Sequence, residues 1–140
     1  VILLFVGFHL AHYTFGWLET RKATDPATGS VVQANYLKLV DEKGRHDVYS
    51  MFVAGFSNPV LASLYILAQI ALCIHLSHGI SSVFQTLGLN TPRLQGFLKK
   101  TAWGIALLLA AGNIGLVVAV LAGFIPELGV DKVFVGTPKH

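Results

Sequence analysis

Charged residues are scarce in this chain of 140 residues: Asp, Glu, Lys and Arg make up only 12% of it, whereas 54% of the residues are hydrophobic. A water-soluble domain has roughly 25% charged residues, so most of this surface is not suited to face water. The basic excess is small, with 10 Lys and Arg against 7 Asp and Glu. The sequence contains no nucleic-acid-binding motif and no basic face with interleaved aromatic side chains. We therefore expect membrane lipid around the chain and no nucleic acid as a partner.

Cysteine is nearly absent as well. Cys73 stands alone inside an apolar run, so an intramolecular disulfide is excluded and the redox compartment stays open. We expect it to be a small packing residue. No basic flank precedes Val1, as it would in a signal peptide, and we expect the first apolar run to continue a helix that begins further upstream.

Three apolar runs contain no Lys, Arg, Asp or Glu: residues 1–18, 59–87 and 101–125. A helix needs about 20 such residues to cross the hydrocarbon core of a bilayer. The alternating segments of about 10 residues that build a membrane β-barrel are missing. The sequence therefore predicts an all-α fold, a multi-pass transmembrane helix bundle that forms one membrane-anchor domain over residues 1–140.

Two polar segments join the three predicted spans. Residues 19–58 are expected to form an extramembrane loop, with a short surface helix at 46–55. Asn58 as N-cap and Pro59 at the first helical position should begin the second span. Residues 88–100 form a short connector with three basic residues and no acidic one. This density of positive charge favours the cytoplasmic side for the connector.

Four of the six histidines lie inside the predicted spans, where ionisable side chains are costly and usually belong to a site. His9 and His12 are on the first helix, and His75 and His78 are on the second. The i, i+3 spacing of each pair predicts that its two side chains share one helix face. The alternative is that each imidazole only hydrogen-bonds to a neighbouring helix.

Small residues surround His75 on its predicted helix face, one and two turns away: Ala68, Ala71, Gly79 and Ser82. They leave room for a flat macrocycle, and histidine is a common axial ligand of haem iron. At 1.5 Å per residue, His9 lies ~15 Å and His75 ~24 Å from the side of the long loop. We therefore expect two haems at different depths, not one iron held by both histidines.

The motif His75-Leu76-Ser77-His78-Gly79 resembles the fourth helix of the di-haem cytochrome b membrane anchor of succinate dehydrogenases and fumarate reductases. The resemblance continues through Phe84-Gln85-Thr86-Leu87-Gly88-Leu89. Two further segments resemble that family's third helix and the entry to its fourth: Gly7-Phe8-His9-Leu10 with His12, and Asp47-Val48-Tyr49 with Gly55-Phe56-Ser57-Asn58-Pro59. The resemblance covers nearly the whole chain and implies the last three helices of a five-helix anchor.

This resemblance implies two haem b groups in the full-length protein. His9 would be an axial ligand of the haem distal to the iron–sulfur subunit, and His75 of the proximal haem, with partner ligands on the two helices that this chain does not hold. His12, His78 and Ser82 would lie next to the haems or to a quinone.

The implied function is electron transfer between the quinone pool, as substrate, and an iron–sulfur subunit with its flavoprotein partner, in a bacterial cytoplasmic membrane. The chain would be a subunit of a succinate:quinone oxidoreductase without a catalytic residue or a succinate site of its own.

Three other functions agree with parts of the pattern. The chain could be the di-haem anchor of another quinone-linked dehydrogenase, such as a formate dehydrogenase or hydrogenase. It could be a proton-coupled transporter that uses the four histidines as a relay, although no proline interrupts a span as often happens in transporters. It could also be a haem-free anchor that only holds soluble subunits at the membrane.

Overall fold

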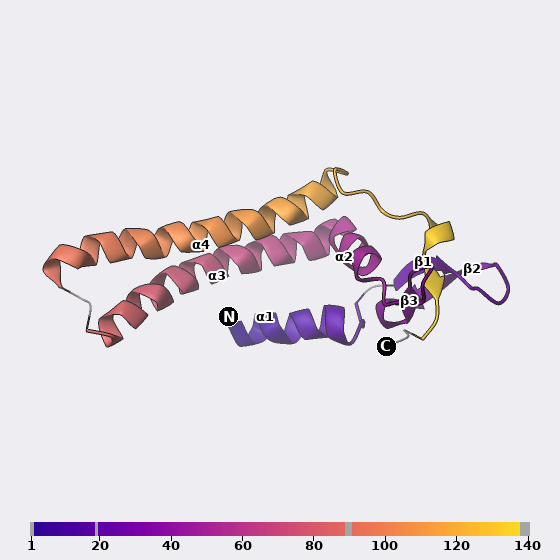
Figure 1. The fold of residues 1–140 in the computed structure, drawn as a ribbon, viewed down its shortest axis with the longest axis horizontal. Helices are drawn as coiled ribbons and strands as arrows, with labels where there is room; N and C mark the ends of the chain where they lie inside the picture. Colours follow the sequence, from indigo (N-terminus) through magenta and orange to yellow (C-terminus); the bar gives the residue numbers. More distant parts are fainter. Residues whose placement is uncertain (1, 19, 89–90, 138–140) are drawn as a thin grey trace. The chain divides into compact units, whose positions relative to one another are not determined.

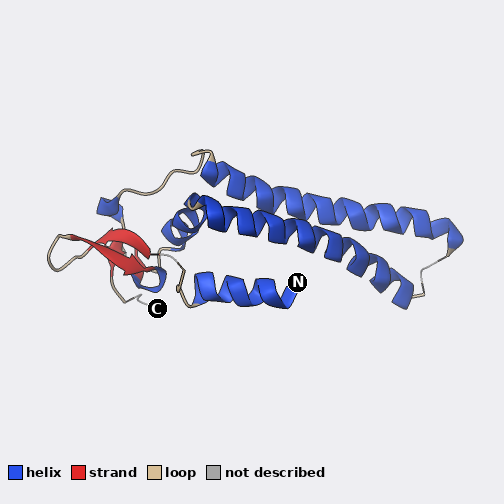
Figure 2. Cartoon of the chain, turned by 180° about the vertical axis from the view of Figure 1, so that it is seen from behind, coloured by secondary structure: helices blue, strands red, loops and turns tan. Residues whose placement is uncertain are grey.

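The computed structural model describes residues 2–18, 20–88 and 91–137. The structure does not describe residues 1, 19, 89–90 and 138–140. Residue 1 belongs to the predicted first span, residue 19 to the predicted loop, and residues 89–90 to the predicted connector. The described chain divides into two compact units. We call residues 63–118 the helical unit, and residues 2–62 together with 119–137 the sheet unit. Helices predominate, and a small sheet accompanies them (Figures 1 and 2).

The sheet unit begins with helix α1 (Ile2–His9), which continues as a π-helix, η1 (Leu10–Thr14). Helical structure therefore covers less of the predicted first span, 1–18, than expected, and the stretch Ile2–Thr14 is shorter than a membrane span. The helix ends before Gly16, which adopts the left-handed conformation with φ of 61°. The Nδ2 group of Asn35 donates a 2.7 Å hydrogen bond to the Gly16 carbonyl and fixes this exit.

The sheet has four strands in the described chain, in the order β2-β1-β4-β3. Strands β1 (Thr20–Thr24) and β2 (Val31–Asn35) form an antiparallel hairpin. Strand β4 (Phe134–Val135) pairs in parallel with β1 and antiparallel with β3 (Leu39–Val40). The expectation of an all-α fold is wrong in this respect. The predicted loop 19–58 contains strands β1, β2 and β3, and β4, about 100 residues further along the chain, completes the sheet.

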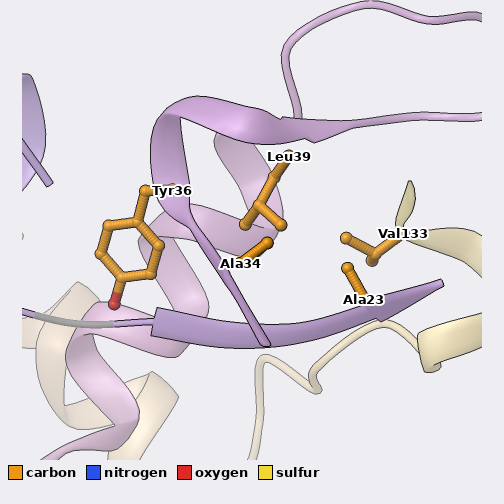
Figure 3. Close-up of a cluster of buried hydrophobic side chains, with 5 residues drawn as sticks. All are labelled: Ala23, Ala34, Tyr36, Leu39 and Val133. Carbon is orange, nitrogen blue, oxygen red and sulfur yellow. The ribbon is translucent and has the colours of Figure 1, made fainter. Parts of the chain in front are cut away.

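The core of the sheet unit explains why this segment folds. Five buried side chains form it: Ala23, Ala34, Tyr36, Leu39 and Val133 (Figure 3). They come from β1, β2, the 3-10 helix η2 (Tyr36–Lys38), β3 and the turn after the 3-10 helix η3 (Val130–Lys132). Burying apolar surface in this way stabilises a fold by about 25 cal/mol per Å², so the C-terminal segment is held by packing as well as by strand pairing.

A buried arginine links three parts of the sheet unit. Arg21 of β1 is only 7% exposed. Its guanidinium donates a 3.2 Å hydrogen bond to the Ser50 carbonyl and a second one to the Leu128 carbonyl. Glu127, half exposed, lies 3.8 Å from it. A buried charge is tolerated only when it is well paired, so these contacts fix helix α2 (Val48–Ser57), which contains Ser50, to the strand.

Helix α2 confirms the short helix expected at 46–55, with small shifts at both ends. Asp47 caps it by accepting a 2.9 Å hydrogen bond from the Ser50 amide. Helix α3 (Pro59–Thr86) follows as predicted, because the Asn58 side chain accepts a 3.0 Å hydrogen bond from the Val60 amide.

Helix α4 (Pro92–Leu121) differs at both ends from the predicted span 101–125. It begins at the proline, so most of the connector expected over 88–100 is helical. It ends before Gly123, which has a φ of 75°. The amides of Gly123 and Phe124 donate to the carbonyls of Val120 and Ala119, respectively. These two hydrogen bonds form a Schellman motif, which satisfies the last carbonyl groups and stops the helix.

Helices α3 and α4 are both long and apolar enough to cross a membrane. Within the helical unit they pack through small side chains, with Cys73 against Ala106 and Ala110. Cys73 is thus a packing residue, as expected. Large apolar side chains elsewhere on the two helices stay exposed, among them Leu108 at 74%. This distribution matches helices in lipid, where small residues make the contacts between helices.

Candidate functional site

His75 lies on the side of α3 that does not contact α4. Its side chain is exposed, whereas Cys73 and Ser77, two residues before and after it, are buried. Two residues correspond to about 200° around a helix, so His75 points away from the α3–α4 contact. Gly79, one turn further on, has open space beside it, since a Cβ atom there would meet nothing within 4 Å. Of the small residues expected to leave room around His75, Gly79 thus has open space beside it, whereas Ser82 lines a cavity to which His75 does not contribute.

His78 and Ser82 line a cavity instead. It has a volume of about 690 Å³ and lies within the helical unit, between the last turns of α3 and the first turns of α4. His75 is not among its lining residues. The spacing of His75 and His78 thus places them on neighbouring parts of α3, but only His78 faces the cavity.

Polar and apolar side chains both line this cavity. The polar ones are Ser77, His78, Ser81, Ser82 and Gln85 from α3 and Gln95 and Lys99 from α4, and the apolar ones include Phe84, Leu98 and Trp103. Two of the serines are satisfied by their own helix, because Ser77 Oγ donates to the Ile74 carbonyl at 2.8 Å and Ser81 Oγ to the Ser77 carbonyl at 2.9 Å. The side chains of His78, Gln95 and Lys99 make no hydrogen bond or ion pair with another described residue.

The sequence reasoning missed the α4 wall of this cavity. A signal was present: Gln95, Lys99 and Trp103 follow one another at intervals of four residues, and His78, Ser82 and Gln85 have helical spacing on α3. Treating residues 88–100 as a connector hid the pattern, because helical spacing is meaningful only within a helix.

His9 and His12 do not share one face, contrary to expectation. His9 is exposed, with its ring centroid 5.4 Å from that of Tyr13. His12 is fully buried, 4.2 Å from the Tyr13 ring and 5.9 Å from the Tyr36 ring. A π-helix has i to i+5 hydrogen bonds and more residues per turn than an α-helix. The change from α1 to η1 after His9 therefore turns His12 to another side.

His12 lies close against helix α2. A Cβ atom on Gly55 would lie 3.0 Å from Cε1 of His12 and 2.6 Å from the Tyr13 hydroxyl oxygen. Only glycine allows the helix backbone to approach these rings so closely. The surroundings of His12 are thus protein, whereas the side chain of His9 is exposed.

No three His, Cys, Asp or Glu side chains gather to hold a metal ion in the described part of the chain. Haem differs from such a site, because its iron takes only one or two axial ligands from the protein. Comparisons of the chain with protein-family models, with curated proteins and with solved structures found no match. A function therefore has to be inferred from the histidines and from the cavity.

Proposed function

We propose that this chain is part of the haem b-binding membrane anchor of a succinate dehydrogenase or fumarate reductase, with α3 and α4 as two of its membrane spans. The observation that carries the proposal is His75: an exposed imidazole in the middle of an apolar helix, on the face away from α4. It lies within the His-Leu-Ser-His-Gly motif, residues 75–79, that resembles the family's fourth helix.

The surroundings of His75 suit a haem. An imidazole in hydrocarbon needs a polar partner, and an iron atom supplies one. A Cβ atom added to Gly79 would meet no side chain of another residue within 4 Å beyond its two chain neighbours, so the helix surface one turn from His75 leaves space for a ligand. A bound haem would carry one electron at a time, and a second axial histidine would come from a helix outside this chain.

His9 is the second proposed haem ligand. Its side chain is exposed on the apolar helix α1, as that of His75 is on α3. His12 is unsuited to the same role, because it is buried against Gly55. In this proposal each of the two histidines holds its own haem, and each haem is completed by a ligand from a helix outside this chain.

The proposed role within the complex follows from the haems. The anchor would exchange electrons with an iron–sulfur subunit, itself linked to a flavoprotein, and with a quinone in a bacterial cytoplasmic membrane. Succinate chemistry would take place on the flavoprotein, so substitutions in this chain would change electron transfer and leave succinate binding intact.

Replacement of His75 tests the proposal. In the full-length protein we expect His75→Ala to remove one haem while the helices stay inserted, since the axial bond to the iron is lost. Haem content and the reduced-minus-oxidised spectrum measure the effect. The control is His46→Ala, because His46 is a histidine of the sheet unit whose Nδ1 lies 3.0 Å from the Leu39 carbonyl oxygen.

An unchanged haem content in His75→Ala would refute the haem site. The choice of electron donor separates the related anchors: haem reduction by succinate in the assembled complex supports the proposed family, whereas reduction by formate or hydrogen alone would assign the chain to another quinone-linked dehydrogenase.

A further inference from the structure

The haem proposal gives no role to the open cavity between α3 and α4. Its volume of about 690 Å³ falls within the range of roughly 300–1,000 Å³ that is typical of ligand sites. His75 is not among its lining residues, so a haem iron on that histidine would lie outside the cavity. The side chains of His78, Gln95 and Lys99, which have no hydrogen-bond partner among the described residues, are therefore open to a different ligand.

The charge of the segment around the cavity favours an anionic ligand. No Asp or Glu occurs anywhere between Asp47 and Glu127, while Arg93, Lys99 and Lys100 all belong to the first turns of α4. Of these cations, Lys99 lines the cavity. Its ammonium group makes no ion pair with a described residue. Glutamine and histidine side chains on both walls supply further hydrogen-bond donors.

The position of the cavity favours an anionic lipid as this ligand. It lies where α3 ends and α4 begins, at one end of the two apolar helices. Basic pockets between membrane helices at this level bind phospholipid head groups. Trp103 lines the cavity one turn beyond Lys99, and tryptophan is enriched at the boundary between head groups and acyl chains.

We propose that this cavity binds the phosphate group of an anionic phospholipid, with Lys99 as its cation. The side chains of Gln85, Gln95 and His78 hydrogen-bond to the head group, and Trp103 packs against its apolar side. The site depends on the helical unit lying in a membrane, but it does not depend on haem at His75.

Lipid retention by the full-length protein tests the site. The protein is reconstituted into vesicles of phosphatidylcholine with one fifth phosphatidylglycerol, or of phosphatidylcholine alone, and is then extracted into mild detergent. Mass spectrometry counts the lipids that remain bound. We expect phosphatidylglycerol to be retained by the wild-type protein, and Lys99→Gln to weaken retention about five- to tenfold, as the loss of one charge-assisted hydrogen bond implies.

Lys100→Gln is the matched control, because Lys100 neighbours Lys99, carries the same charge and does not line the cavity. It should retain the lipid as the wild type does, and Lys99→Arg should restore retention. Gln95→Leu provides a second test that leaves the charge unchanged, with an expected two- to fivefold loss. If the Lys99→Gln protein fails to insert into the membrane, lipid retention by Gln95→Leu tests the proposed site instead.

Four results would overturn the proposal. Equal losses in Lys99→Gln and Lys100→Gln would mean diffuse surface charge. Equal retention of both lipids would exclude recognition of an anion. Complete displacement of phosphatidylglycerol by millimolar inorganic phosphate would make free phosphate the ligand. A loss of haem in Lys99→Gln with unchanged lipid would make the occupant a haem carboxylate. Haem measured in the same samples reports separately on the proposed function.

Discussion

The sheet unit and the helical unit bury their side chains in different ways. The sheet unit encloses Tyr36, Leu39 and Val133 completely and surrounds them with strands and a short helix. The helical unit buries mainly small residues, such as Ala102 and Ala106, and leaves large apolar side chains such as Leu108 exposed. The pattern around the strands is that of a water-soluble domain, and the pattern of the helical unit is that of helices in lipid. Helix α1 belongs to the sheet unit but resembles the helical unit in this respect, because Leu3 and Leu4 are 85% and 80% exposed.

The polar side chains show the same difference. In the sheet unit, the buried Arg21 is satisfied by carbonyl groups of the chain itself. In the helical unit, His75 lies open on the helix surface and Lys99 faces a cavity. Polar groups that are already satisfied contribute to structure, whereas unsatisfied ones on an apolar helix indicate a site for a ligand. The comparison therefore assigns stability to one unit and ligand binding mainly to the other.

The largest expected effect challenges this division, because His9 belongs to the sheet unit. We expect His9→Ala to remove a haem, and to remove a spectral component different from the one lost in His75→Ala. The reason is that each histidine would hold its own iron. Redox titration of the haem bands in both variants measures this. Loss of the same component in both would rule out two separate haem sites.

A smaller effect is expected from truncating one leucine in each unit. Leu39→Ala should destabilise the sheet unit by about 2–5 kcal/mol, because a fully buried side chain leaves a cavity. Leu108→Ala, in the helical unit, should change stability by less than about 0.5 kcal/mol, because its side chain packs against little protein. Hydrogen exchange of peptides covering residues 31–40, in lipid nanodiscs, measures the first change. Equal effects of the two substitutions would contradict the comparison.

Glycine substitutions sharpen the comparison further. Gly55→Ala should cost about 1–3 kcal/mol, because the added methyl group collides with Tyr13 and His12 and forces them to move. Gly79→Ala meets nothing within 4 Å in this structure, and in haem-free protein it should stabilise α3 by about 0.5–1 kcal/mol, as expected for alanine in a helix interior. Thermal unfolding of the two variants provides the measurement. Destabilisation by Gly79→Ala would mean that something in the full-length protein already fills the space beside His75.

The smallest effect concerns an exposed turn of the sheet unit. The backbone amide of Arg45 donates to Asp41 and, aided by the Arg45 side chain and the Lys43 amide, holds the pKa of this carboxyl below 3.8. A lowered pKa stabilises the fold above about pH 3.8, and this contribution is lost as the pH falls through the folded-state value.

NMR titration of the Asp41 carboxyl carbon checks this. Arg45→Gln should raise the pKa only in part, because the backbone hydrogen bond remains. A pKa at or above 3.8 in the wild type would contradict the expectation.

Much of the helical unit could be predicted from the sequence because its signals are local. A run without charges predicts a membrane helix, and Asn58-Pro59 predicts where α3 begins, since capping depends only on adjacent residues. The sheet was missed for the opposite reason. Alternation of Arg21 and Ala23 toward the interior is a weak signal in five residues, and β4 has only two residues. Such a strand exists only through its pairing partners.

The sequence by itself therefore determined that this protein has long apolar helices, where α3 begins, and that histidines lie within two apolar segments. Only the tertiary structure decided what those histidines face. A local π-helix and the close approach of Gly55 bury His12, and the α3–α4 contact leaves His75 open while His78 lines a cavity. The physical reason is that side-chain spacing fixes directions around one helix, whereas burial depends on which other segment packs against each face.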